Sequence, residues 1–208
     1  MNPVRLTLIV TGHGEIEAVP ILIRRIAAET NPSLAVDIPG ILRVPESSLR
    51  QAGQLERHVE RAAELLQGSG GVLILLDCDW EGGCPAQEGP ALLARARLKR
   101  PDKLIAVVLA KQEYEAWFLA AAESLAGRRG LPINLTAPAD PETIRGAKEW
   151  LRSRMPANRA YSETIDQPKL TAALDLEMAR RADSFDKFYR DISSILHTLA
   201  SECGHPNA

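Results

Sequence analysis

Residues 71–79 read Gly71-Val72-Leu73-Ile74-Leu75-Leu76-Asp77-Cys78-Asp79. The apolar run is short, aliphatic and preceded by glycines, which predicts a strand buried on both faces of a parallel sheet. Such strands present their last residues at the carboxyl edge of an α/β sheet, where ligands bind. Alternate residues of a strand share one side, so Asp77 and Asp79 can reach one divalent cation while Cys78 points away. Alternatively, the two acids are solvated turn residues or caps of the next helix.

Strand and helix patterns alternate on both sides of this run. Further strands are expected at 5–10, 35–41 and 104–109, and helices at 15–29, 51–66, 91–100 and 115–125, with a loop at 81–90. The alternation predicts an α/β fold with a mostly parallel sheet and helices on both faces.

Beyond Gly127 the pattern predicts helices only. They are expected at 141–155, 170–182 and 184–199, with an irregular segment at 155–168 and Ser184 as the N-cap of the last helix. The chain is therefore divided into an α/β domain at 1–126 and a helical C-terminal extension at 127–208 that packs on it.

Composition narrows the classes of protein. The 208 residues are 45% apolar and 25% charged, and their net charge of −2 argues against a strongly basic nucleic-acid-binding body. The three cysteines, Cys78, Cys84 and Cys203, lack the C-x-x-C spacing of a zinc ribbon and are too few for a disulfide framework. No signal-peptide pattern or membrane-length apolar run occurs. We therefore expect a cytoplasmic protein without a membrane partner.

A glycine turn, Thr11-Gly12-His13-Gly14-Glu15, follows the first strand. Backbone amides at a helix N-terminus bind anions, so Gly12, His13 and Gly14 are candidates for binding phosphate. The turn lacks the Gly-Lys-Ser/Thr ending of a Walker loop and the third glycine of the dinucleotide fingerprint, and simple strand-to-helix geometry explains it equally well. Glu15 lies nearer the strand end than Glu17, and it can turn toward Asp77 if the two strands are neighbours.

A second acidic segment, Lys111-Gln112-Glu113-Tyr114-Glu115-Ala116-Trp117-Phe118-Leu119, follows the fourth strand. Glu113 is expected over the carboxyl edge, as a metal ligand or general base, with Lys111 as a phosphate-binding cation. Glu115 opens a helix, where the helix dipole favours an acid without any function. Trp117 and Phe118 are expected in the core.

These acids form one candidate site. Asp77, Asp79, Glu113 and Glu15 would repel one another without a cation, and oxygen-only ligands favour Mg²⁺ or Mn²⁺ over zinc. A cation held by two aspartates can polarise a phosphoryl oxygen and activate water, while Lys111 stabilises the developing charge. The sequence therefore predicts metal-dependent phosphate chemistry.

Four motifs carry a resemblance to a known family. They are the glycine turn followed by Glu15-x-x-x-Val19-Pro20, the strand Leu75-Leu76-Asp77-x-Asp79, the segment 112–120, and Asp166-Gln167-Pro168-Lys169-Leu170-Thr171. Together they resemble the family called domain of unknown function 4276 almost end to end, and that family is similar in plan to Toprim domains. The resemblance implies a Toprim-like Mg²⁺ site for cleaving or forming nucleic acid phosphodiesters, and an ATPase as partner. A homodimer is compatible with it.

One residue departs from the Toprim pattern. The chain has Thr11 where that pattern places glutamate at the end of the first strand, and a threonine cannot act as a general base near neutral pH. Either Glu15 or Glu113 replaces it, or the protein is a degenerate binding or regulatory subunit. A nucleotide-sugar transferase with a D-x-D cation site is a further alternative. A haloacid-dehalogenase-type phosphatase fits less well, because its aspartate pair should follow the first strand.

Overall fold

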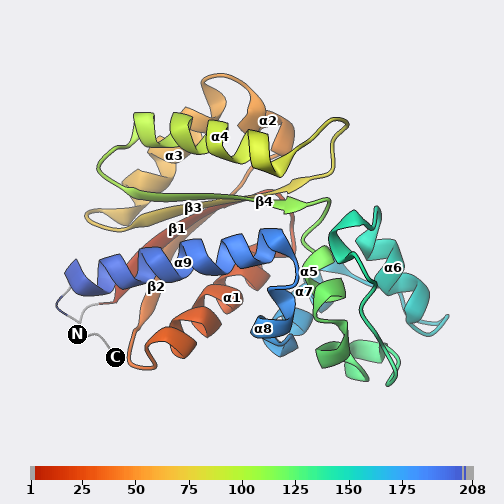
Figure 1. Ribbon diagram of the computed structural model, residues 1–208. Coiled ribbons are helices and arrows are strands. Elements are labelled where there is room, and N and C mark those ends of the chain that lie inside the picture. Colours follow the sequence, from red (N-terminus) through yellow and green to blue (C-terminus); the bar gives the residue numbers. More distant parts are fainter. Residues whose placement is uncertain (1–2, 203, 205–208) are drawn as a thin grey trace.

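Residues 3–202 and 204 are described by a computed structural model, in which four parallel strands form one sheet with helices on both faces (Figure 1). The strands are β1 (Val4–Val10), β2 (Val36–Arg43), β3 (Gly71–Cys78) and β4 (Leu104–Lys111). Their order across the sheet is β2-β1-β3-β4, and all three neighbouring pairs are parallel. The predicted α/β fold is confirmed, and the strands that carry the candidate acids are neighbours.

Two helical layers cover the sheet (Figure 1). Helices α1 (Glu15–Thr30) and α9 (Asp183–Glu202) lie on one face, and α2 (Glu46–Arg50), α3 (Gln54–Leu66) and α4 (Pro85–Lys99) lie on the other. Strand β3 divides its side chains between two cores, with Leu73 and Leu75 in one and Val72, Ile74 and Leu76 in the other. Burial on both faces explains why its apolar run is continuous rather than alternating.

A third group of helices gathers at the end of the sheet where β4 finishes (Figure 1). It contains α5 (Ala116–Ala120), α6 (Ala147–Arg154), α7 (Glu163–Ala173), α8 (Leu176–Ala179) and the 3₁₀ turns Ala122–Leu125, Arg128–Gly130 and Pro141–Thr143. Trp117 and Phe118 are fully buried as predicted, and Trp117 packs against Phe185 and Phe188 of α9. This group therefore closes over the carboxyl edge and joins it to α9.

Several predicted helix boundaries were wrong. Helix α4 begins at Pro85, inside the predicted loop at 81–90, because proline suits the first turn of a helix. The predicted helix at 115–125 is the short α5 followed by a 3₁₀ turn, and α7 already begins at Glu163 in the segment expected to be irregular. Only 147–154 of the helix predicted at 141–155 is α-helical.

Ser184 is not the N-cap of the last helix. Helix α9 begins at Asp183, and the carboxylate of Glu142 accepts hydrogen bonds from the amides of Asp183 and Ser184, both at 3.0 Å. The Ser184 hydroxyl oxygen instead accepts from Trp117 Nε1 (2.8 Å) and from the Lys111 amide (3.3 Å). It thereby ties α9 to the end of β4.

Within the described residues, each helix is too short or too polar to cross a membrane.

Candidate functional site

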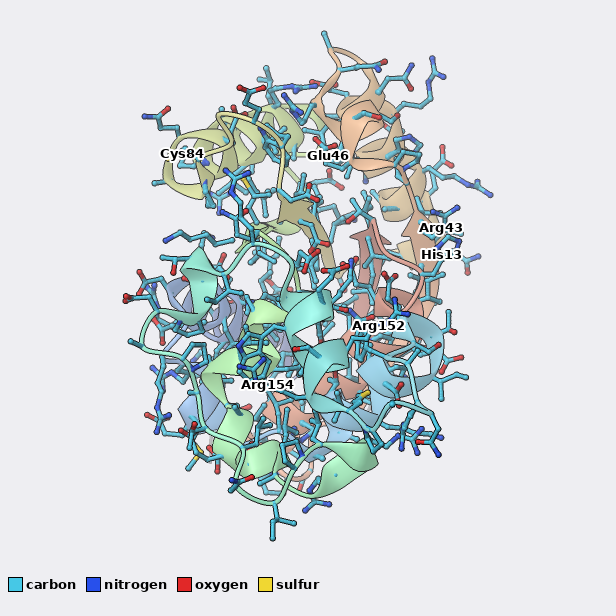
Figure 2. All side chains as sticks on the ribbon, turned by 90° about the vertical axis from the view of Figure 1, so that its right-hand side faces the viewer. His13, Arg43, Glu46, Cys84, Arg152 and Arg154 are labelled. Atoms are coloured by element: carbon cyan, nitrogen blue, oxygen red, sulfur yellow. The ribbon has the colours of Figure 1, made fainter. Side chains whose placement is uncertain are left out.

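The carboxyl edge of the sheet faces the viewer in Figure 2. Asp77 is the second-last residue of β3, Glu15 is the first residue of α1 after β1, and Glu113 and Glu115 follow β4. Because β1, β3 and β4 are neighbours in register, their ends bring these acids to one place. The convergence expected from the sequence is therefore present in the fold.

Asp77 occupies the centre of this edge. Its Oδ1 accepts a hydrogen bond from the Tyr114 amide at 2.8 Å, which links the end of β3 to the segment after β4. Burial, the largest cause, and the negative charges of Glu113 and Asp79 together raise the pKa of Asp77 to about 7, against the opposing effects of Lys148 and the Tyr114 amide. Asp77 is thus a partly buried carboxylate in a field of like charges.

Glu15 lies beneath the glycine turn, with 1% of its surface exposed. Its Oε2 accepts hydrogen bonds from the amides of Thr11 (2.9 Å) and Gly12 (3.0 Å). Burial, and then the charge of Asp77, raise the pKa of Glu15 well above its usual value. Glu17, by contrast, is exposed. Two amides of the predicted phosphate turn therefore bind the protein's own carboxylate.

Glu115 is fully buried, although the sequence suggested only a helix-opening acid. Its Oε1 accepts hydrogen bonds from Tyr161 Oη (2.8 Å) and Gln167 Nε2 (3.4 Å), while Oε2 has no hydrogen-bond donor among the described residues. Burial, the largest cause, and the charge of Asp77 raise the pKa of Glu115 to about 8, against the opposing charge of Lys148. An incompletely satisfied, buried carboxylate is costly and indicates a functional role.

Lys148 is the cation of the site, and sequence reasoning missed it. Its Nζ lies 3.2 Å from Glu163 Oε1 and 3.9 Å from both Glu113 Oε1 and Glu115 Oε2, and its amide donates to Glu113 Oε2 at 3.1 Å. Burial lowers the pKa of Lys148, but the surrounding carboxylates outweigh it and raise the pKa above its usual value. The ammonium group therefore stays charged and links β4, α6 and α7.

The backbone before Glu113 is unusual. Gln112 has a φ of 67°, a left-handed conformation that is uncommon for residues other than glycine. This turn at the end of β4 aims Glu113 and the Tyr114 amide back over the sheet edge. Such strained residues often lie at functional sites.

The other predicted site residues lie at three places. Asp79 is exposed beyond the end of β3, on the rim beside Asp77. Lys111 pairs with Cys78 and lies on the same face of the sheet as that residue. It lines a largely apolar hollow with Cys84 and Leu109, and the candidate acids Glu15, Asp77, Asp79 and Glu113 do not line this hollow. His13 is exposed at the mouth of a second hollow, which Lys148 and Tyr161 also line. The structure thus brings together Glu15, Asp77, Asp79 and Glu113, but not Lys111.

Gly14 has a packing role in the glycine turn. A Cβ atom there would overlap Gln167 Oε1 and lie 2.5 Å from the carbonyl oxygen of Glu163, both in α7. Its φ of −69° is open to any residue, so the need for glycine comes from the close approach of α7. That approach holds Gln167 against Glu115.

The carboxylate oxygens at this edge suit a hard cation that keeps part of its shell of bound water. No three His, Cys, Asp or Glu side chains of residues 3–202 and 204 are arranged to hold one metal ion together. Mg²⁺, however, commonly binds through one or two carboxylates, with waters and substrate phosphates completing its shell. The oxygen-only chemistry of Asp77, Asp79 and Glu113 and the buried Oε2 of Glu115 fit such an ion.

Asp166 anchors the segments that surround the site. It is 2% exposed, its Oδ1 accepts from Arg129 (2.9 Å) and Arg159 (2.8 Å), and its Oδ2 accepts from the Ser162 amide (3.0 Å). Burial alone would raise the pKa of Asp166, but these hydrogen bonds hold it below its ordinary value. The contacts position the start of α7 and thus Tyr161 and Gln167.

We expect Asp166→Asn to lower the free energy of unfolding by about 2 kcal/mol at neutral pH, because two charge-assisted hydrogen bonds are lost. A depressed folded-state pKa contributes stability above the unfolded pKa of about 3.9, and that contribution disappears as the pH falls through the folded value. Urea titrations should therefore show the gap between wild type and variant closing below about pH 4.

Asp37→Asn is the control for this prediction, because the Asp37–Arg5 pair is more exposed and should contribute less than about 1 kcal/mol. Two outcomes would contradict the anchoring role of Asp166: equal losses of unfolding free energy in the two variants, or a difference between wild type and Asp166→Asn that grows as the pH falls.

The fold and the site together define an α/β protein with a parallel sheet and a carboxylate-rich site at its carboxyl edge. The family model described as Domain of unknown function (DUF4276) matches residues 10–193, and the chain belongs to this family. No curated protein and no solved structure gives a significant match.

Proposed function

We propose that the protein is a Mg²⁺- or Mn²⁺-dependent enzyme that cleaves or transfers nucleic acid phosphodiesters at the carboxyl edge of its sheet. The observation that carries the proposal is the convergence of Asp77, Glu113 and Glu115 around one cation, Lys148, with Glu15 next to Asp77. Close carboxylates destabilise one another unless a cation shares them. Lys148 alone does not balance the charge of four carboxylates, and a metal ion bound at this edge would supply the missing positive charge.

Asp77 and Asp79, with Glu113 nearby, would hold the ion. The Tyr114 amide occupies one oxygen of Asp77, which fixes the orientation of the carboxylate. When bound, the ion would supply Lewis-acid polarisation of a phosphoryl oxygen and a more acidic water. This ligand set resembles that of a Toprim-like site, and that likeness is part of the proposal.

The remaining residues have roles that follow from their contacts. The Thr11 and Gly12 amides hold Glu15 Oε2, so this carboxylate is rigid, and its raised pKa makes it a stronger base than an ordinary carboxylate. Thr11 therefore contributes through its backbone, and Glu15 supplies the carboxylate that the threonine lacks. Lys148, held by Glu113, Glu115 and Glu163, is the cation that would stabilise negative charge on a phosphoryl group.

A second candidate function is a non-catalytic subunit that binds or regulates an ATPase. Two observations favour it: the first strand is followed by Thr11 rather than an acid, and the described residues lack a three-ligand metal site. Calorimetry separates the candidates. A protein that binds no Mg²⁺ or Mn²⁺ at millimolar metal but forms a stable complex with an ATPase would be a subunit of this second kind.

The cellular setting belongs to the same proposal. We propose a cytoplasmic location from the cysteine pattern. An ATPase partner is proposed from the family resemblance. Both Cys78 and Cys84 are free thiols in the structure.

The direct test of the enzymatic proposal is a cleavage assay on supercoiled plasmid, single-stranded DNA and single-stranded RNA. Wild-type protein should cleave at least one of them with Mg²⁺ or Mn²⁺ and none in excess EDTA. Cleavage that persists in EDTA, or no cleavage of any substrate with either metal, would refute the proposal.

A further inference from the structure

Basic side chains concentrate in and around α6. Segment 143–160 contains five basic residues and one acidic residue, Glu149, a net of +4 in a chain whose net charge is −2. The basic residues are Arg145, Lys148, Arg152, Arg154 and Arg159. Arg152 and Arg154 lie on the face seen in Figure 2, as do His13 and Arg43 from the edge of the sheet. This cationic surface therefore lies at the carboxyl edge, beside the acids.

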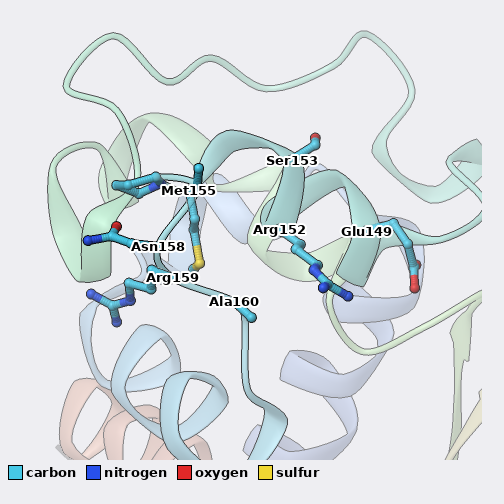
Figure 3. Close-up of a pocket in the computed structure, with 9 residues that line it drawn as sticks. Glu149, Arg152, Ser153, Met155, Asn158, Arg159 and Ala160 are labelled. Carbon is cyan, nitrogen blue, oxygen red and sulfur yellow. The ribbon is translucent and has the colours of Figure 1, made fainter.

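The surface is hollowed on both sides of Arg152. One hollow, of about 690 Å³, is lined by residues 152–153 and 155–160 together with Glu149 (Figure 3). The other, of about 400 Å³, is lined by His13, Lys148, Glu149, Arg152, Tyr161, Glu163 and Thr164. Glu149 and Arg152 line both hollows, so the two adjoin. Figure 3 shows the Arg152 and Glu149 side chains projecting from the same side of α6.

The smaller hollow leads to the buried acids. Two of its lining residues contact Glu115, since Tyr161 Oη donates to Oε1 at 2.8 Å and Lys148 Nζ lies 3.9 Å from Oε2. Lys148 and Arg152 are one helical turn apart, about 6 Å along α6. A row of polar side chains therefore runs from Arg159 in the larger hollow, past Arg152, to Lys148 and His13 in the smaller one. Arg159 and Lys148 are already paired with carboxylates, so Arg152 supplies the positive charge that no ion pair offsets among the described residues.

We propose that this row, Arg159, Arg152, Lys148 and His13, is the track on which single-stranded nucleic acid enters the acidic site. Cationic grooves with aromatic rings are typical of single-strand binding, and Tyr161 and His13 place rings in the smaller hollow. The smaller hollow, of about 400 Å³, suits the bases and phosphates of one strand better than the breadth of a duplex. This inference rests on the proposed function and specifies its substrate.

The test measures binding without cleavage. Fluorescence anisotropy in EDTA would use a labelled single-stranded oligonucleotide of about 16 nucleotides, as DNA and as RNA, and a blunt DNA duplex of the same sequence. At least one single strand should bind more tightly than the duplex. Arg152→Glu should weaken single-strand binding about tenfold at low salt, and Arg152→Ala should reduce the salt slope of log K by about 0.7.

Arg97→Glu provides the matched control, because Arg97 is exposed in the last turn of α4 and remote from the carboxyl edge. It should change affinity less than about twofold, since distant surface charges are screened. Arg152 forms no ion pair within the described part of the chain, so its replacement should leave the fold intact. Circular dichroism and the melting temperature check this.

The inference is overturned by tighter binding of the duplex, by equal effects of Arg152→Glu and Arg97→Glu, or by binding to anionic lipid vesicles but to no oligonucleotide. Its failure is distinguishable from failure of the proposed function. Metal-dependent cleavage that is insensitive to Arg152→Glu would reject the track alone. Single-strand binding that depends on Arg152, without cleavage under any metal condition, would reject the enzyme and keep the track.

Discussion

Asp77→Asn should reduce metal-dependent cleavage by about a thousandfold or more, because it removes the central ligand charge of the site. The variant should nevertheless fold, since asparagine retains an oxygen that can accept the Tyr114 amide hydrogen bond. Initial cleavage rates at saturating Mn²⁺ measure the effect. Asp102→Asn, which changes an exposed acid at the other end of the sheet beside β4, should cleave at the wild-type rate.

The same substitution should stabilise the protein without metal. Burial raises the folded-state pKa of Asp77 to about 7, above the unfolded value of about 3.9, so the wild type loses stability as the pH rises between these values. At pH 8 in EDTA, Asp77→Asn should therefore be more stable by about 1 to 2 kcal/mol. Mn²⁺ should raise the melting temperature of wild type but not of the variant. An Asp77→Asn protein that is destabilised and still cleaves would contradict both expectations.

Gly14→Ala should lower the free energy of unfolding by about 3 kcal/mol, because the added methyl group overlaps Gln167 Oε1 and approaches the Glu163 carbonyl oxygen at 2.5 Å. The backbone at Gly14 is open to alanine, so steric contact with α7 is the whole cause. Displacing α7 also moves Gln167 away from Glu115, and cleavage should fall as well. Urea denaturation measures the loss of stability.

Gly89→Ala is the control for Gly14→Ala. Gly89 lies within α4, and the nearest atom to its added Cβ would be Leu109 Cδ1 at 3.9 Å, an ordinary contact. Alanine is the better helix former, so this variant should gain up to about 1 kcal/mol. If Gly14→Ala proved as stable as Gly89→Ala, the close packing of α1 on α7 would be wrong.

The strands and their parallel direction could be predicted, because buried parallel strands are continuous apolar runs that can be recognised in the sequence alone; the order of the strands could not. The positions of Glu15 and Asp77 at the carboxyl edge could be predicted for the same reason, since each lies near the end of a strand that the apolar pattern identifies. Helix bounds were less predictable, because prolines such as Pro90 and Pro168 suggest breaks but lie inside helices. The sequence made the glycine turn a candidate for binding phosphate. In the structure, the Thr11 and Gly12 amides donate hydrogen bonds to Glu15, and Gly14 packs against α7.

The centre of the site depends on contacts that no local pattern shows. Glu115 looked like a helix-opening acid, and its burial arises only when Tyr161 and Gln167 fold over it from distant segments. Lys148 lies in a basic helix with no motif of its own, and its partners come from the segment after β4 and from α7. Lys111 is the last residue of β4, and its register beside Cys78 turns it to the face opposite Asp77.

The most direct test of a cation at the carboxyl edge is the anomalous scattering of crystals soaked in Mn²⁺. The account predicts a peak about 2.1 Å from a carboxylate oxygen of Asp77, with Asp79 or Glu113 nearby, that disappears in Asp77→Asn crystals. The absence of a peak at millimolar Mn²⁺, or a peak only at sites remote from Asp77, would contradict it.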